Sequence, residues 1–162
     1  MSVKVDKSVW NQLKKDLKKL DDVQLSIGWF PENQYGSDNN NLPMAYVAAL
    51  NEFGHVNGSD AAIPGAITPP RPFMRAGFIP ALKAGANKKD FQFVIEQALK
   101  GKSPLVAMQQ IAPNLEKTLK KIMEGWSTPP NAPLTVELKG FNDPLKRSGE
   151  LIDSVTAKVE KK

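Results

Sequence analysis

The chain of 162 residues has no cysteine and a single histidine, His55. The absence of cysteine excludes disulfides and thiolate chemistry, and it fits assembly in a reducing cytoplasm. With one histidine, only carboxylates remain to complete a metal site, so we expect His55 to be structural or solvent-exposed and predict no metal and no cofactor. No apolar run approaches the roughly 18 residues of a membrane span, so no membrane contact is expected.

Arginine is also scarce. Only three of the 22 basic residues are arginines, Arg71, Arg75 and Arg147. The net charge is +5 and the sequence pI is about 9.4, with the excess weighted towards residues 83–162. Arginine makes directional, bidentate contacts, whereas lysine is a solvated point charge. Specific contacts are therefore expected at the three arginines.

Signatures of catalysis are missing as well. Ser148, His55 and Asp153 could form a triad on paper, but Ser148 is not in a Gly-x-Ser-x-Gly turn. Neither a Gly-x-Gly-x-x-Gly nor a phosphate-binding Gly-x-x-x-x-Gly-Lys sequence occurs. The chain is therefore predicted not to be an enzyme.

The composition, 41% hydrophobic and 24% charged, is typical of one soluble globular domain, here residues 1–162. Residues 23–30 and 152–158 alternate apolar and polar side chains, and we predict that they pair as strands. The fold class predicted is α+β, a small antiparallel sheet packed with several helices and long exposed loops. The helices covering the sheet are expected at residues 6–22, 43–53 and 104–126, and the mobile loops at 32–42 and 55–69.

Apolar residues at helical spacing define the expected buried faces. In the first helix Asp6 is the expected N-cap, and the lysines are expected on a solvated face. Further helices are expected from about residue 87 to 100 and from Pro104, where Pro113 should kink or split the helix. The predicted buried residues are Val9, Leu13, Leu17 and Leu20; Tyr46, Val47, Leu50 and Phe53; and Phe91, Val94, Ile95, Ala98 and Leu99. The three tryptophans, Trp10, Trp29 and Trp126, are expected in the core rather than as stacking platforms for nucleic acid.

The stretch 48–73 is the one around which the chain is organised. Gly54 is expected to end the preceding helix in a left-handed conformation, and three prolines in residues 68–73 impose an extended path. Arg71 and Arg75 are expected to project from this path as a docking surface, with Glu52 pairing with one of them. Phe73 should anchor the far end in the core.

Two separated motifs stand out. The first is Asn51-Glu52-Phe53-Gly54 followed by Pro70-Arg71-Pro72-Phe73-Met74-Arg75. The second is Trp126, then Asn131-Ala132-Pro133-Leu134-Thr135, Lys139-Gly140, Pro144-Leu145, Ser148-Gly149-Glu150-Leu151 and Ser154-Val155. Their order and spacing resemble a family of tailed-bacteriophage morphogenesis proteins described as tail completion, head–tail joining or minor tail components. The resemblance spans about residues 45–159.

This resemblance implies a non-enzymatic structural protein of the virion, at the neck or upper tail, assembled in the host cytoplasm. The implied form is a homo-oligomeric ring, with the connector or stopper, the tail terminator or the tail tube as partners. Residues expected at such interfaces are Glu52, Arg71, Arg75 and Arg147. A tail terminator is the alternative within this class, and a small nucleic-acid-binding module is the alternative from another class. The basic C-terminal portion would either face DNA in the lumen or be merely solvated, and both remain open.

Overall fold

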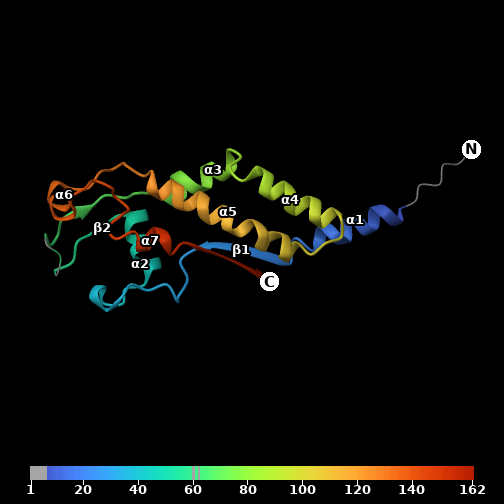
Figure 1. The fold of residues 1–162 in the computed structure, drawn as a ribbon, viewed down its shortest axis with the longest axis horizontal. Helices are drawn as coiled ribbons and strands as arrows, with labels where there is room; N and C mark the ends of the chain where they lie inside the picture. The colour runs from blue at the N-terminus through green and yellow to red at the C-terminus, as the bar shows by residue number, and fades with distance from the viewer. Residues whose placement is uncertain (1–6, 60, 62) are drawn as a thin grey trace, which may run out of the picture. The chain divides into compact units, whose positions relative to one another are not determined.

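A computed structural model of the chain describes residues 7–59, 61 and 63–162, and its elements are shown in Figure 1. The helices and small antiparallel strands confirm the predicted α+β class. None of the helices in the described part of the chain combines the length and apolarity that a membrane crossing requires. The helices are α1 (Ser8–Lys18), η1 (Ser37–Asn39), α2 (Met44–Phe53), η2 (Phe73–Phe78), α3 (Ile79–Lys83), α4 (Lys88–Leu99), α5 (Pro104–Glu124), α6 (Pro133–Lys139) and α7 (Glu150–Asp153); the strands are β1 (Val23–Gly28), β2 (His55–Val56), β3 (Ile67–Thr68) and β4 (Thr156–Lys161).

Contacts within the chain group its residues into two compact units. Unit 1 takes the described part of Met1–Ile27, with Asn87–Leu115 and Ala157–Lys162, and unit 2 takes the described part of Gly28–Ala86 with Glu116–Thr156. The single domain expected from the sequence stays a prediction.

The strand pairing in the first sheet is confirmed, with one shift of boundary. β1 pairs with β4, and the N–H of Lys162 extends the pairing by donating to the carbonyl of Asp22 at 2.9 Å. The strand expected to begin at residue 152 begins instead at Thr156, because Ile152 lies in the short helix α7. A strand would send Leu151 and Ile152 to opposite faces, whereas this single helical turn buries both.

In unit 1, α1 packs against α4, but its apolar stripe is not the buried face that was predicted. Val9 and Leu17 are exposed, and Trp10, expected in the core, keeps 56% of its surface exposed. The buried residue is Asp16. Hydrogen bonds from Lys19 (2.7 Å) and Gln12 (3.0 Å) hold the pKa of the Asp16 carboxyl below its usual value. The proposed cap Asp6 lies outside the described residues.

The predictions for α4 and α5 are partly right. The helix α4 buries Val94 and Ala98, whereas the predicted core residues Phe91, Ile95 and Leu99 keep 41–47% of their surface exposed. The helix α5 begins at Pro104 as predicted, and it continues through Pro113 without being split (Figure 1).

Unit 2 is built around Phe73, which is fully buried as predicted. The Trp29 ring meets Phe73 edge-on, with ring centroids 5.9 Å apart, and the Trp29 indole N–H donates to the carbonyl of Leu151 at 2.8 Å. The Trp126 ring packs against Gly77, where an added Cβ would lie 3.0 Å from the indole ring. These two tryptophans therefore pack against other residues of unit 2, although each stays partly exposed.

The buried face of α2 differs from the predicted one. It consists of Met44, Ala48 and Glu52, while Tyr46 and Phe53, two of the predicted stripe, are exposed.

The two segments expected to be mobile loops contain local structure. The segment 32–42 includes the 3-10 turn η1, and the N–H of Tyr35 donates to the carbonyl of Leu42 at 3.0 Å. Within residues 55–69, β2 and β3 form an antiparallel ribbon. The mobility of both segments stays a prediction.

Candidate functional site

Arg71, expected to project from the proline segment, is buried instead, with 6% of its surface exposed. Its backbone N–H donates to the carbonyl of Asn51 at 2.7 Å. Its guanidinium donates to the carbonyl oxygens of Pro129 (3.3 Å) and Pro130 (3.4 Å). It also donates to the side-chain oxygens of Asn51 and Asn131, each at 3.3 Å. The prediction of a projecting Arg71 is therefore wrong.

The reason for this burial lies in the segment that Arg71 contacts. Pro129 and Pro130 stand outside any helix or strand, so their carbonyl oxygens receive no donor from regular secondary structure, and the guanidinium donates to them instead. A guanidinium supplies five donors in a fixed fork and can satisfy several of them together. Burial lowers the pKa of Arg71 from its usual value, and among the described residues no carboxylate lies within ion-pair distance of it.

Glu52 is buried beside this arginine network, with 5% of its surface exposed. Its carboxylate accepts hydrogen bonds from the backbone N–H of Met74 and of Arg75, both at 2.9 Å, and from the Arg75 side chain at 3.0 Å. The expected pairing of Glu52 with one of the two arginines is thus confirmed for Arg75. Since a helix leaves its first N–H groups unpaired, Glu52 fastens the start of η2 to α2.

Arg75 remains at the surface. Its guanidinium lies over the ring of Phe53, 4.5 Å from the ring centroid, and Phe53 keeps 63% of its surface exposed. Of the two arginines in the first motif, only Arg75 is therefore placed to meet another molecule.

At Gly54, the backbone of the proline segment passes close to the end of α2, so the two parts of the first motif lie side by side. The φ of Gly54, 73°, is positive as expected, but its ψ of 167° is extended, so it is not a left-handed helical cap. A Cβ at this position would lie 2.8 Å from the backbone of both Thr68 and Pro70. Only glycine allows the proline segment to pass this close to the end of α2.

Replacing Gly54 with alanine should therefore lower the free energy of unfolding by roughly 2–5 kcal/mol, since backbone strain and steric overlap both act. The matched control is Gly140→Ala, because Gly140 has φ 77° but no atom near an added Cβ. This control should lose only about 1–2 kcal/mol. Urea denaturation measures both variants, and equal losses would show that the approach to Pro70 is not tight.

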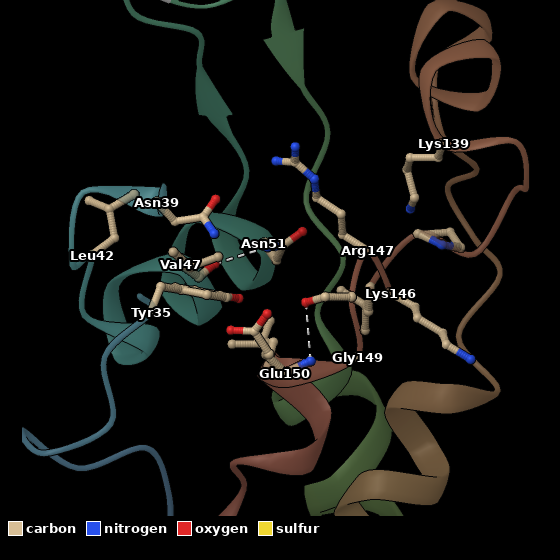
Figure 2. A pocket seen from close by; sticks show the side chains of 14 residues that line it. Tyr35, Asn39, Leu42, Val47, Asn51, Lys139, Lys146, Arg147, Gly149 and Glu150 are labelled. Atoms are coloured by element: carbon tan, nitrogen blue, oxygen red, sulfur yellow. Dashed lines mark hydrogen bonds between the residues drawn. The ribbon is translucent and has the colours of Figure 1, made fainter. Parts of the chain in front are cut away.

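A hollow of about 440 Å³ opens beside the arginine network (Figure 2). Side chains from α2 and the loop before it form one side, and side chains from the segment 139–151 form the other. Asn51 belongs to both structures, because it lines the hollow and accepts from Arg71. The lining residues are Tyr35, Asn39, Leu42, Val47, Asn51, Lys139, Pro144, Leu145, Lys146, Arg147, Ser148, Gly149, Glu150 and Leu151.

The hollow is cationic, because its lining contains Lys139, Lys146 and Arg147 but one carboxylate, Glu150. Burial, together with the positive charges of Arg71 and Arg147, lowers the pKa of Lys139 from its usual value. Burial and the negative charge of Glu150 raise the pKa of the Tyr35 hydroxyl, which favours its neutral, hydrogen-bonding form. A carboxylate or phosphate from a partner is the chemical group that this set of side chains suits best.

The residues of the hypothetical triad have different partners. The Ser148 hydroxyl accepts a hydrogen bond from the N–H of Glu150 at 3.4 Å, while His55 Nδ1 lies 3.3 Å from the carbonyl oxygen of Leu50. Among the described residues, no group of three His, Asp or Glu side chains is placed to hold a metal ion.

Of the four residues predicted to face partners, two are buried and two lie at the surface. Glu52 and Arg71 are buried, whereas Arg75 and Arg147 are exposed. Sequence reasoning missed the contribution of Tyr35 and Lys139 to the hollow, because their elements are about 100 residues apart and share no motif. A scan against family models, a search of curated proteins and a search of solved structures each find no match to this chain.

Proposed function

We propose that this chain is a structural protein of a tailed bacteriophage that acts in head–tail joining or tail completion. The observation that carries the proposal is the set of hydrogen bonds from Arg71 to Asn51 and to residues 129–131. Arg71 and Asn51 belong to the first motif that resembles the phage family, and Asn131 belongs to the second. The two motifs, separated by more than 50 residues, therefore meet in one buried network.

Other motif residues support the same reading. Glu52 binds the start of η2, and Gly54 allows Pro70 to approach. Phe73 fills the core. Residues that make such specific contacts are those that a shared fold would require, and this supports the proposal.

In this proposal the protein acts by contact and carries out no reaction. It forms a ring of identical subunits at the neck or upper tail, between the connector or stopper on one side and the tail on the other. The exposed Arg147 at the cationic hollow supplies the contact with an acidic group of a neighbouring virion protein. Arg75 and Phe53 form a second exposed contact. A tail terminator at the top of the tail tube is the alternative position.

The test is deletion of the gene from the phage that encodes it, followed by complementation. Without the protein, negative-stain microscopy should show separate heads and tails, and the wild-type chain should restore joined particles. Cryo-electron microscopy of intact particles then locates the ring and separates a joining protein from a tail terminator. Normal joined particles in the deletion strain would overturn the proposed function.

Arg147→Ala tests the hollow in the same assay. Arg147 is exposed, so the variant should melt like the wild type, yet joined particles should fall about tenfold because a charge-assisted contact is lost. The control is Lys117→Ala, which removes an exposed cation of unit 2 outside the hollow. Full restoration by Arg147→Ala would exclude this residue as a contact while leaving the rest of the proposal in place.

A further inference from the structure

The positive charge of the chain is distributed unequally between the two units. The segments of unit 1 contain 13 lysines and 7 acidic residues, a net charge of +6, whereas those of unit 2 contain 9 basic and 10 acidic residues, a net charge of −1. The excess that the sequence places in the C-terminal half thus belongs to unit 1, to which the N-terminal helix α1 also contributes. All three arginines lie in unit 2, so every basic residue of unit 1 is a lysine.

Several of these lysines surround one depression. It has a volume of about 530 Å³ and is lined by the turn after α1, the α4–α5 connection and the end of β4. Its charged residues are Lys19, Lys102, Lys161, Lys162 and a single carboxylate, Asp22.

Most of this charge is not neutralised within the protein. Lys19 pairs with Asp16 at 2.7 Å, but among the described residues Lys102, Lys161 and Lys162 have no carboxylate within ion-pair distance. The backbone at Lys162 is fixed beside Asp22, because the N–H of Lys162 donates to the carbonyl of Asp22 at 2.9 Å. Lys102 follows a turn at Gly101, with φ 72°, and lines the same depression. Like charges gathered this way repel one another, so an anion would relieve the repulsion.

We propose that this depression, which we call the lysine depression, is a binding site for the phosphate backbone of nucleic acid. The absence of arginine in unit 1 distinguishes this partner from an acidic protein. Protein interfaces are enriched in arginine and depleted in lysine, because the planar guanidinium fixes a carboxylate in one geometry. Lysines bind a row of phosphates as point charges without reading the base sequence.

This inference goes beyond head–tail joining and does not depend on it, because binding can be measured on the isolated protein. The expected partner is double-stranded DNA of any sequence, bound through salt-sensitive phosphate contacts. Failure to bind DNA would leave the joining assay unaffected, and failure to join particles would leave DNA binding unaffected.

The experiment is fluorescence anisotropy with a short labelled duplex DNA, titrated with the full-length protein between about 50 and 200 mM salt. The test variant is K102Q/K161Q/K162Q. Each phosphate contact contributes about 0.9 to the slope of log K against log salt, so the variant should lose about 2–3 from the slope and bind about tenfold more weakly or worse. Two duplexes of unrelated sequence should bind equally.

A control triple variant, K15Q/K88Q/K89Q, removes the same charge from exposed positions of unit 1 outside the lysine depression. It should retain most of the slope, and circular dichroism should show both variants folded. Equal losses in the two variants would overturn the site, since net charge alone would then explain binding. Tighter binding to polyglutamate or to anionic vesicles than to DNA would also overturn it, in favour of an acidic protein or a membrane surface.

Discussion

Replacing Phe73 with alanine should lower the free energy of unfolding by about 3–5 kcal/mol, the range for removing a buried aromatic ring. Phe73 is 0% exposed and meets the edge of Trp29 at an interplanar angle of 87°. Trp29 is itself fixed by the hydrogen bond to Leu151, so it is not free to move into the space that the ring leaves. The cavity would therefore persist, and its cost would add to the lost burial.

Urea denaturation followed by tryptophan fluorescence measures this loss close to the site, because Trp29 is the neighbour of Phe73. The control is Phe91→Ala, which removes the same ring from a position on α4 that keeps 41% of its surface exposed. This variant should lose about 1 kcal/mol or less. If both variants lost the same amount, the central position of Phe73 in the core would be wrong.

The features that the sequence predicted correctly are those with a local pattern. Alternation of apolar and polar residues located the β1 strand, and Pro104 was correctly expected to start α5. Phe73 was recognised as an anchor because it is a large apolar residue next to a rigid proline segment. In each case the deciding residues lie within a few positions of one another, so a pattern in the sequence can report them.

The buried face of α2 could not be found in this way. A carboxylate is normally placed in solvent, so the presence of Glu52 suggested that its face of α2 is exposed. The apolar side chains of Tyr46 and Phe53 suggested that their face is buried. Both indications were wrong. The N–H groups that make burial of Glu52 favourable belong to Met74 and Arg75, 22 and 23 residues further along the chain. Helical periodicity carries no information about donors at that distance.

The burial of Arg71 also depends on partners that are distant in the sequence. It changes the effect that we expect when the Arg71 side chain is removed. A projecting arginine would be dispensable for folding. The observed side chain instead binds oxygens of residues 129–131, which lie 58 to 60 positions away. Replacing Arg71 with alanine should therefore lower the free energy of unfolding by about 2–4 kcal/mol, because the buried side-chain oxygen of Asn131 and three partly buried oxygens would lose their donor.

Two further variants separate the causes of this loss. Arg71→Met keeps a long apolar stem but removes all donors, so it should be nearly as unstable as Arg71→Ala if the hydrogen bonds dominate. Arg71→Lys keeps the charge but replaces a planar fork by a single ammonium group. It should recover less than half of the loss, because one ammonium group cannot reach Asn51 and the carbonyls of Pro129 and Pro130 in the same geometry.

The same variants, tested in the phage complementation assay, show whether Arg71 supports the fold or contacts a partner protein directly. If Arg71 supports the fold, joined particles should fall only in proportion to the folded protein, and growth at lower temperature should restore them in part. Arg147→Ala should show the opposite behaviour, with normal melting and a joining defect at every temperature. If Arg71→Ala melts like the wild type while joining fails, Arg71 meets a partner directly, and the buried network is not what holds the two motifs together.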